Sequence, residues 1–188
     1  RIHEFLLLYP DITIEIRLND AELDLAMREA DVAIRLHRPN QSEMIQRKLF
    51  TVHNHFYMSL DYLAQYGEPK TTEDLDNHRI VTFGEPIPSA IADVNWLETA
   101  GRPDGSRRTA HLQINDLLAI KRAVRRGAGI AALPDYMVQK DSGLVQLLPE
   151  SHVPSFDTYF AYTDAMKSQV KLQVFRDFLI AKARNWSF

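Results

Sequence analysis

Helical and strand-like patterns alternate along this sequence, and this alternation constrains the fold more than any other feature. Apolar residues recur at helical spacing over residues 2–9, and residues 12–18 (ITIEIRL) then alternate apolar and polar side chains as a half-buried strand does. A short helix is expected over residues 21–29, before a buried strand at 31–36 (DVAIRL). Strands separated by helices need crossover connections, and crossovers favour a parallel sheet covered by helices. The sequence therefore predicts an α/β fold.

A second strand–helix–strand unit lies at residues 113–138 (QINDLLAIKRAVRRGAGIAALPDYMV). Asn115 and Asp116 are the side chains best able to cap its helix, and Gly127 supplies a left-handed stop. The apolar run at 130–133 then enters the sheet. The helix start is therefore expected at the carboxyl end of a strand, which is the edge where α/β sheets bind ligands.

The other elements are predicted from local patterns and end signals. They are a strand at 44–58, a helix at 59–67 between Ser59 and Gly67, a capping signal at Thr71 and Asp74, a buried strand at 79–83, a hairpin of strands 94–98 and 108–114 around GRPDG, strands at 144–148 and 158–163, and a last helix capped near Ser168 with Val170, Val174, Phe175, Phe178 and Leu179 facing the core.

Composition excludes several classes of protein. The chain has 45% apolar and 25% charged residues, as ordinary globular domains do, and a net charge of −3 that argues against a nucleic-acid-binding surface over the whole chain. The absence of cysteine removes disulfides, thiolate zinc sites and cysteine nucleophiles. No apolar run reaches the roughly 18 to 20 residues that cross a bilayer, and no signal-peptide pattern is present, so a cytoplasmic protein without membrane contact is expected.

The polar residues at the start of the 117–126 helix admit two interpretations. Asn115 and Asp116 can line a pocket for a small, anionic metabolite, because unpaired N–H groups at a helix start attract anions, or they can simply cap the helix. The cations near the helix end favour the negative end of the helix dipole, with a DNA- or phosphate-binding patch as the alternative; they are Lys121, Arg122, Arg125 and Arg126.

Catalysis and metal binding find little support in the sequence. It contains no nucleophile elbow, phosphate-binding loop, zinc-protease motif or dinucleotide fingerprint, so the chain is not expected to be an enzyme, and no cofactor is expected. His53 and His55 are two apart on the strand expected at 44–58, hence on one face, but a third metal ligand is missing, so no metal site is predicted.

Several phrases, in order over nearly the whole chain, resemble the effector-binding domain of LysR-type transcriptional regulators. They are FLLLYPDITIEI (5–16), ELDLAMREADVAIRL (22–36), RKL (47–49), SLDYLAQYGEPKTTEDLDNHRIVTF (59–83), INDLLAIKRAVRRGAGIAALPDYMV (114–138) and VFRDFLIAKA (174–183).

The resemblance implies two Rossmann-like lobes joined by two crossover strands, like type 2 periplasmic binding proteins, with a small effector in the cleft. The first lobe is expected at residues 1–56 plus 157–188 and the second at 57–156. It also implies a homodimer or homotetramer, with DNA bound only through an N-terminal winged helix-turn-helix that this sequence does not include. The family's first strand is likewise missing, because the sequence begins within the next helix, as a fragment would.

Candidate ligand-binding residues follow from the resemblance and from position at strand ends facing the cleft. Arg35 can pair with a ligand carboxylate or form a structural salt bridge, and His37 can donate to a ligand or lie in an exposed loop. The full set is Asn19, Arg35, Leu36, His37, Thr82, Phe83, Asn115, Asp116, Leu133 and Pro134.

A solute-binding protein of a transporter is the alternative function, because it shares the lobed fold. The coding sequence upstream distinguishes the two, since a helix-turn-helix predicts a regulator and an export signal predicts transport.

Overall fold

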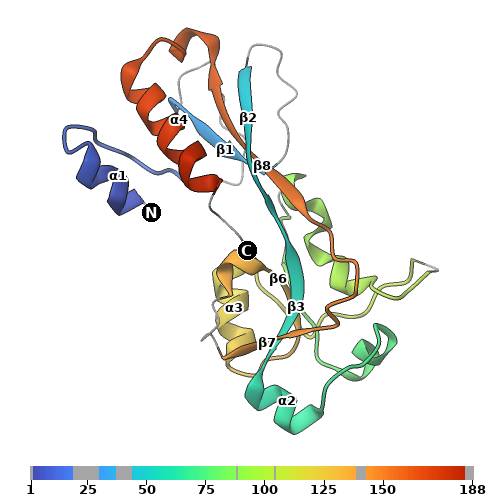
Figure 1. Cartoon of the computed structure of the whole chain (residues 1–188). Coiled ribbons are helices and arrows are strands. Elements are labelled where there is room, and N and C mark those ends of the chain that lie inside the picture. Colours follow the sequence, from blue (N-terminus) through green and yellow to red (C-terminus); the bar gives the residue numbers. More distant parts are fainter. Residues whose placement is uncertain are drawn as a thin grey trace. The chain divides into compact units, whose positions relative to one another are not determined.

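The chain divides into two compact units (Figure 1). Unit 1 is built from residues 1–51 and 156–187, and unit 2 from residues 52–155, so the chain passes between the units twice. The computed structural model describes residues 2–18, 30–36, 44–87, 89–103, 105–138 and 143–184.

Unit 1 contains a three-stranded sheet in the order β1–β8–β2. Strand β1 (Ala33–Arg35) pairs antiparallel with β8 (Phe156–Thr163), Ala33 opposite Ala161, and β2 spans Met44–Val52. The parallel pairing predicted for residues 31–36 is therefore not the one observed at β1, because its partner β8 comes from the other end of the chain and runs in the opposite direction. The helices of this unit are α1 (Ile2–Leu8), the 3₁₀ helix η4 (Asp164–Met166) and α4 (Val170–Ala183).

The strand predicted at residues 12–18 is not a strand among the described residues. The segment has no ladder partner in the described part of unit 1, although its sequence keeps the period-two pattern. A strand needs a hydrogen-bonded neighbour, which periodicity alone does not supply. The helix predicted at 21–29 lies outside the described residues.

An aromatic core holds unit 1 together. Phe5 of α1 is fully buried and meets Phe175 and Phe178 of α4 edge to face, at ring-centroid distances of 5.0 and 5.2 Å. Helix α4 buries Leu172, Phe178 and Leu179, whereas Val170 is 72% exposed. The predicted core stripe is correct except at Val170, which lies in the first turn. The predicted cap near Ser168 is also wrong, since the N-cap residue is Gln169 and its side chain makes no capping bond.

Unit 2 comprises the remaining elements. They are β3 (Asn54–Ser59), α2 (Leu60–Tyr66), the 3₁₀ helix η1 (Glu73–Asn77), β4 (Val81–Thr82), the 3₁₀ segment η2 (Ser89–Glu98), β5 (Leu112–Gln113), α3 (Leu117–Arg125), β6 (Ala131–Pro134), the 3₁₀ helix η3 (Asp135–Met137) and β7 (Leu144–Leu147). Strand β3 lies between β6 and β7 and pairs antiparallel with both (Figure 1).

Strands β4 and β5 are parallel, with Val81 opposite Leu112. A parallel bridge between Ile80 and Ile130 joins this pair to β6, through Val81 N–H to the Ile130 carbonyl (2.8 Å) and Ile130 N–H to the Arg79 carbonyl (2.8 Å). Gly129 makes the close approach possible, because its φ is +154° and an added Cβ would lie 2.3 Å from the Arg79 carbonyl oxygen. Unit 2 therefore has the parallel strands that the 113–138 stretch predicts.

The helix caps that the sequence predicts at Ser59 and at Thr71 and Asp74 are observed in unit 2. Ser59 Oγ accepts from Tyr62 N–H (3.1 Å) and caps α2, which ends at Gly67. At the start of η1, Asp74 N–H donates to Thr71 Oγ1 (3.3 Å), while Asp74 Oδ2 accepts from Thr71 N–H (2.9 Å). This is the predicted reciprocal capping pair, although it begins a 3₁₀ rather than an α-helix.

The predicted hairpin of residues 94–98 and 108–114 is wrong. Residues 94–98 belong to η2, and β5 pairs with β4 instead. The helical conformation places Leu97 in the core at 1% exposure and stacks Trp96 on Phe56, with ring centroids 5.2 Å apart. A five-residue pattern cannot distinguish these two burial modes, so tertiary packing decides.

Candidate functional site

The parallel strands of unit 2 bring three predicted pairs of residues to one edge. Thr82 ends β4 and Phe83 follows it, Asn115 and Asp116 come just after β5, and β6 ends at Leu133 and Pro134. Gly84 N–H donates to the Ile114 carbonyl (3.2 Å), and Ile114 N–H donates to the Thr82 carbonyl (3.1 Å), so the ends of β4 and β5 lie side by side. Phe83 and Leu133 pack in one apolar cluster, which brings in the end of β6.

Asn95 closes the end of β4. Its side-chain oxygen accepts from Phe83 N–H (2.8 Å) and its amide nitrogen donates to the Phe83 carbonyl (2.8 Å). Asn95 is 7% exposed, and both of its polar atoms are satisfied by one backbone position. Asn95 was not among the predicted site residues, since the surrounding DVNWLE carries no signal that separates it from a strand residue.

Thr82 is the polar residue at this edge whose hydroxyl is left without a protein partner. The residue is 4% exposed, and Thr82 Oγ1 has no hydrogen bond among the residues that the structure describes. Buried hydroxyl groups are satisfied in most proteins, so such an atom calls for a specific partner.

Asn115 and Asp116 are both exposed but differ in their contacts. Asp116 Oδ1 accepts from Ala119 N–H (2.6 Å) and caps α3, as the capping interpretation requires. Asn115 makes no comparable side-chain bond within the described ranges and stands next to the backbone of Gly84. Of the two, Asn115 is the one whose amide is available to a ligand.

The apolar members of the set lie in the core. Leu133 is fully buried and Phe83 is 6% exposed, so their side chains stabilise the edge rather than offer polar contacts. Just beyond Pro134, Asp135 Oδ1 is 2.7 Å from His55 Nδ1 and accepts from the Tyr57 hydroxyl (2.9 Å). Burial, with the bond to Asp135, raises the pKa of Tyr57 above its ordinary value. This cluster carries no local sequence signal, because Asp135 is 80 residues from His55 and 78 from Tyr57.

In unit 1 the structure describes Arg35 and Leu36 at the end of β1. Arg35 is 7% exposed and lies opposite Tyr159 in the ladder. The candidates Asn19 and His37 lie outside the described residues.

The structure does not support a metal site at His53 and His55. His53 lies between β2 and β3, so it does not share one strand with His55 as the pattern predicted. Across the described residues, no group of three or more His, Cys, Asp or Glu side chains is arranged to hold a metal ion. Likewise, none of the described helices combines the length and apolar character needed to cross a bilayer.

Helix α3 separates apolar and basic faces. Ile120 and Val124 are buried, while Arg122 and Arg125 are exposed in the last turn. Their position agrees with the helix-dipole interpretation, since cations stabilise a helix C-terminus.

Comparisons with known proteins agree with the fold. Residues 1–184 match the family model described as the LysR substrate binding domain. An uncharacterised HTH-type transcriptional regulator of Haemophilus influenzae is 28% identical over 179 residues, covering 89% of this chain and 58% of its own. The HTH-type transcriptional regulator CrgA of Neisseria meningitidis is 27% identical over 181 residues, covering 94% of this chain and 59% of its own.

Solved structures give the same assignment. The CrgA regulatory domain from Neisseria meningitidis superposes with a TM-score of 0.82 at 25% identity, over 97% of this chain and 89% of that one. Full-length AphB of Vibrio cholerae, a virulence activator of the LTTR family, gives 0.74 at 26% identity, over 96% of this chain and 61% of that one.

These matches are regulators rather than transport proteins, which favours the first of the two functions considered above. The chain spans less than two thirds of the length of the curated regulators it matches. The α/β fold of the type 2 periplasmic-binding-protein kind is confirmed, and the chain belongs to the LysR substrate binding domain family.

Proposed function

We propose that this chain senses a small metabolite for a LysR-type transcriptional regulator, and that units 1 and 2 are its two regulatory subdomains. The observation that carries the ligand site is the meeting of three strand ends in unit 2, with the buried Thr82 hydroxyl and the exposed Asn115 amide at the same edge. The carboxyl ends of parallel strands are where α/β sheets bind ligands.

The chemistry of this edge suits a small polar or anionic ligand. Thr82 supplies a hydroxyl and Asn115 an amide, each able to donate to an oxygen of the ligand. Asp116 holds the helix start in place, and Phe83, Leu133 and Pro134 keep the floor apolar. We keep Asn19, Arg35, Leu36 and His37 of unit 1 as candidate effector contacts, with the Arg35 guanidinium as the group for a carboxylate.

The relatives supply the rest of the proposal. They are HTH-type transcriptional regulators, and this chain matches little more than half of each. We infer that a DNA-binding segment acts together with this domain, that the assembly is a homodimer or homotetramer in the cytoplasm, and that ligand binding couples to its arrangement on DNA. Catalysis has no part in this proposal.

Reading the gene upstream of residue 1 tests the regulator directly. A helix-turn-helix is expected there, whereas an export signal instead would contradict the proposal and restore the transporter alternative.

The ligand site is tested by screening small carboxylic acids and sugars against the chain by calorimetry. For a compound that binds, Thr82→Val and Asn115→Ala are each expected to weaken affinity roughly fivefold or more, as loss of a hydrogen bond of about 1 kcal/mol implies. Gln65→Ala is the matched control, because Gln65 is an exposed amide on α2, away from this edge. Equal effects of Asn115→Ala and Gln65→Ala on affinity would show that the strand ends do not form the ligand site.

In the regulator itself, Asn115→Ala and Arg35→Ala are expected to reduce the response to ligand while operator affinity stays the same. Equal losses in both measurements would contradict a sensing role for these residues.

A further inference from the structure

A polar hollow opens at the other end of the β4–β5 pair from the strand ends discussed above. We call it the amino-end hollow. It has two adjoining parts of about 190 and 310 Å³, and Asp76, His78 and His111 line both. Ile80 and His111 come just before the paired residues of β4 and β5, so the hollow lies at their amino ends. All of its lining residues belong to unit 2.

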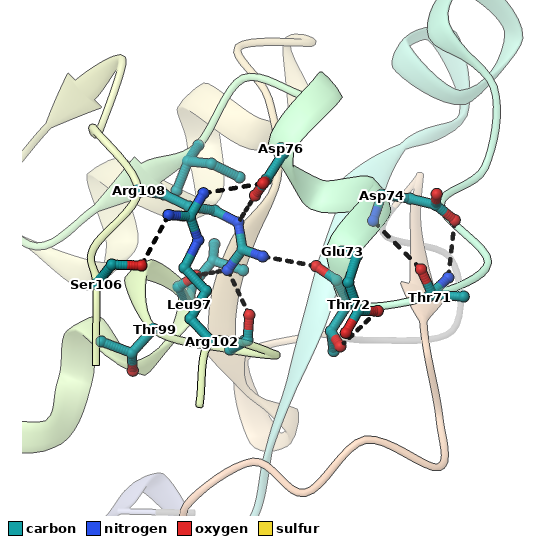
Figure 2. A network of polar contacts seen from close by, with 12 residues as sticks. Thr71, Thr72, Glu73, Asp74, Asp76, Leu97, Thr99, Arg102, Ser106 and Arg108 are labelled. Atoms are coloured by element: carbon teal, nitrogen blue, oxygen red, sulfur yellow. Dashed lines mark hydrogen bonds and ion pairs between the residues drawn. The ribbon is translucent and has the colours of Figure 1, made fainter. Parts of the chain in front are cut away.

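One wall is a fixed ion-pair network (Figure 2). Arg108 is 6% exposed and donates to Asp76 Oδ1 (2.5 Å) and to the carbonyls of Thr72 (2.7 Å) and Ala100 (2.5 Å). Arg102 donates to Asp76 Oδ2 (2.9 Å) and to Ser106 Oγ (3.0 Å). Hydrogen bonds from Arg102 and Arg108 lower the pKa of Asp76. Because both of its carboxylate oxygens accept from arginines, Asp76 is a poor ligand for a cation.

A second wall holds Arg79 in position. Its guanidinium carbon lies 5.4 and 4.9 Å from the ring centroids of Tyr62 and Tyr66, and Nη2 donates to the Tyr66 hydroxyl (2.8 Å). Its backbone N–H donates to the Tyr62 hydroxyl (2.9 Å). The remaining guanidinium N–H groups have no partner within the described part of the chain, so they are free to donate.

The two histidines add donors between these walls. Ile80 N–H donates to His111 Nδ1 (3.3 Å), so neutral His111 carries its proton on Nε2. His78 is 8% exposed, and its Nδ1 has no hydrogen-bond partner among the described residues. Burial lowers the pKa of His78, against an opposing effect of the Asp74 carboxylate.

We propose that the amino-end hollow is a second ligand site and binds a small oxyanion, a carboxylate or a phosphate. Three guanidinium groups and a single, fully engaged carboxylate line it, so the formal charge of its lining is positive. Asp74, which is not a lining residue, adds a negative charge near His78. Arg79 and His111 offer N–H donors, and a guanidinium binds either anion through paired hydrogen bonds. A volume of about 310 Å³ is at the lower end of small-molecule sites, which limits the ligand to a compact molecule.

This proposal does not rest on the function proposed above. The strand ends with Thr82 and Asn115 share no residue with the hollow, and either site can fail while the other holds. A ligand here would act on unit 2 alone.

Two-dimensional NMR of the 188-residue chain tests the site with two probes, inorganic phosphate and succinate, each titrated at constant ionic strength. Saturable shifts are expected at the Ile80 amide and the ring nitrogens of His78 and His111, with a dissociation constant of about 10 mM or tighter. The Phe178 amide, on α4 of unit 1, is the internal reference, because it belongs neither to the hollow nor to the strand ends of unit 2. Shifts with either probe support the site, and their relative strength separates phosphate from carboxylate ligands; saturation with neither overturns it.

Three variants decide whether the hollow is responsible. Arg79→Gln removes the free guanidinium, and His111→Asn removes the Nε2 donor while its side-chain oxygen can still accept from Ile80 N–H. Each is expected to weaken binding by about tenfold, as loss of a charge-assisted or paired contact implies. Arg122→Gln is the charge-matched control, because Arg122 is an exposed cation on α3 outside the hollow, and its affinity should stay within about twofold of the parent. Equal losses for Arg79→Gln and Arg122→Gln would show general charge attraction and overturn the proposal.

Discussion

Gly129 gives the sharpest test of how unit 2 is held together. An alanine Cβ at this position would lie 2.3 Å from the Arg79 carbonyl oxygen and 2.9 Å from its carbon, both of which are backbone atoms. That carbonyl is the acceptor for Ile130 N–H (2.8 Å), one of the two bonds that join β6 to the β4–β5 pair. Gly129→Ala must therefore move one strand away from the other.

The expected loss of stability in Gly129→Ala has two contributions. A non-glycine residue at a positive φ costs about 1 to 2 kcal/mol. Displacing the Arg79 carbonyl leaves the buried Ile130 N–H unsatisfied, at a further cost of about 1 to 3 kcal/mol. Gly67→Ala isolates the first contribution, because Gly67 has a φ of +80° and an added Cβ would meet nothing within 4 Å.

Urea unfolding followed by circular dichroism and by tryptophan fluorescence measures both variants. Gly129→Ala is expected to lower the free energy of unfolding by about 1 to 3 kcal/mol more than Gly67→Ala does. Equal losses, within about 0.5 kcal/mol, would refute the conclusion that close strand contact requires this glycine.

Other expected outcomes test single contacts. Asp116→Ala should cost about 1 kcal/mol of stability through loss of the α3 cap, whereas Asn115→Ala should change urea stability by less than about 0.5 kcal/mol; equal effects would contradict the assignment of the cap to Asp116. Arg108→Met should cost about 3 kcal/mol or more because three carbonyls and Asp76 lose their donor, against at most about 1 kcal/mol for Arg122→Met at the surface of α3, and similar urea midpoints would argue against a structural role for Arg108. Burial lowers the pKa of His78 below the usual value of about 6.5, so the unfolded chain binds more protons and stability should fall as the pH drops through 6.5; a His78→Leu variant with the same pH dependence would exclude His78 as the source.

The candidate site could be predicted only in part. The helix cap at Asp116 and the left-handed glycine at 127 follow from local chemistry, and both are observed. Asn95 and the His55–Asp135–Tyr57 cluster could not be predicted, because each joins residues that are remote in sequence. The amino-end hollow was missed for the same reason: Arg79, Arg102 and His111 stand in unrelated segments.

Local patterns in the sequence were enough to predict the helices at residues 2–8, 60–66 and 117–125, since apolar spacing and end signals act within a few residues. They could not specify strand partners. The period-two pattern at residues 12–18 has no ladder among the described residues, residues 94–98 became a 3₁₀ helix, and β1 pairs with β8 from the far end of the chain. A strand is completed only by hydrogen bonds to a neighbour, so tertiary structure alone decided which strands pair and which side chains meet at their ends.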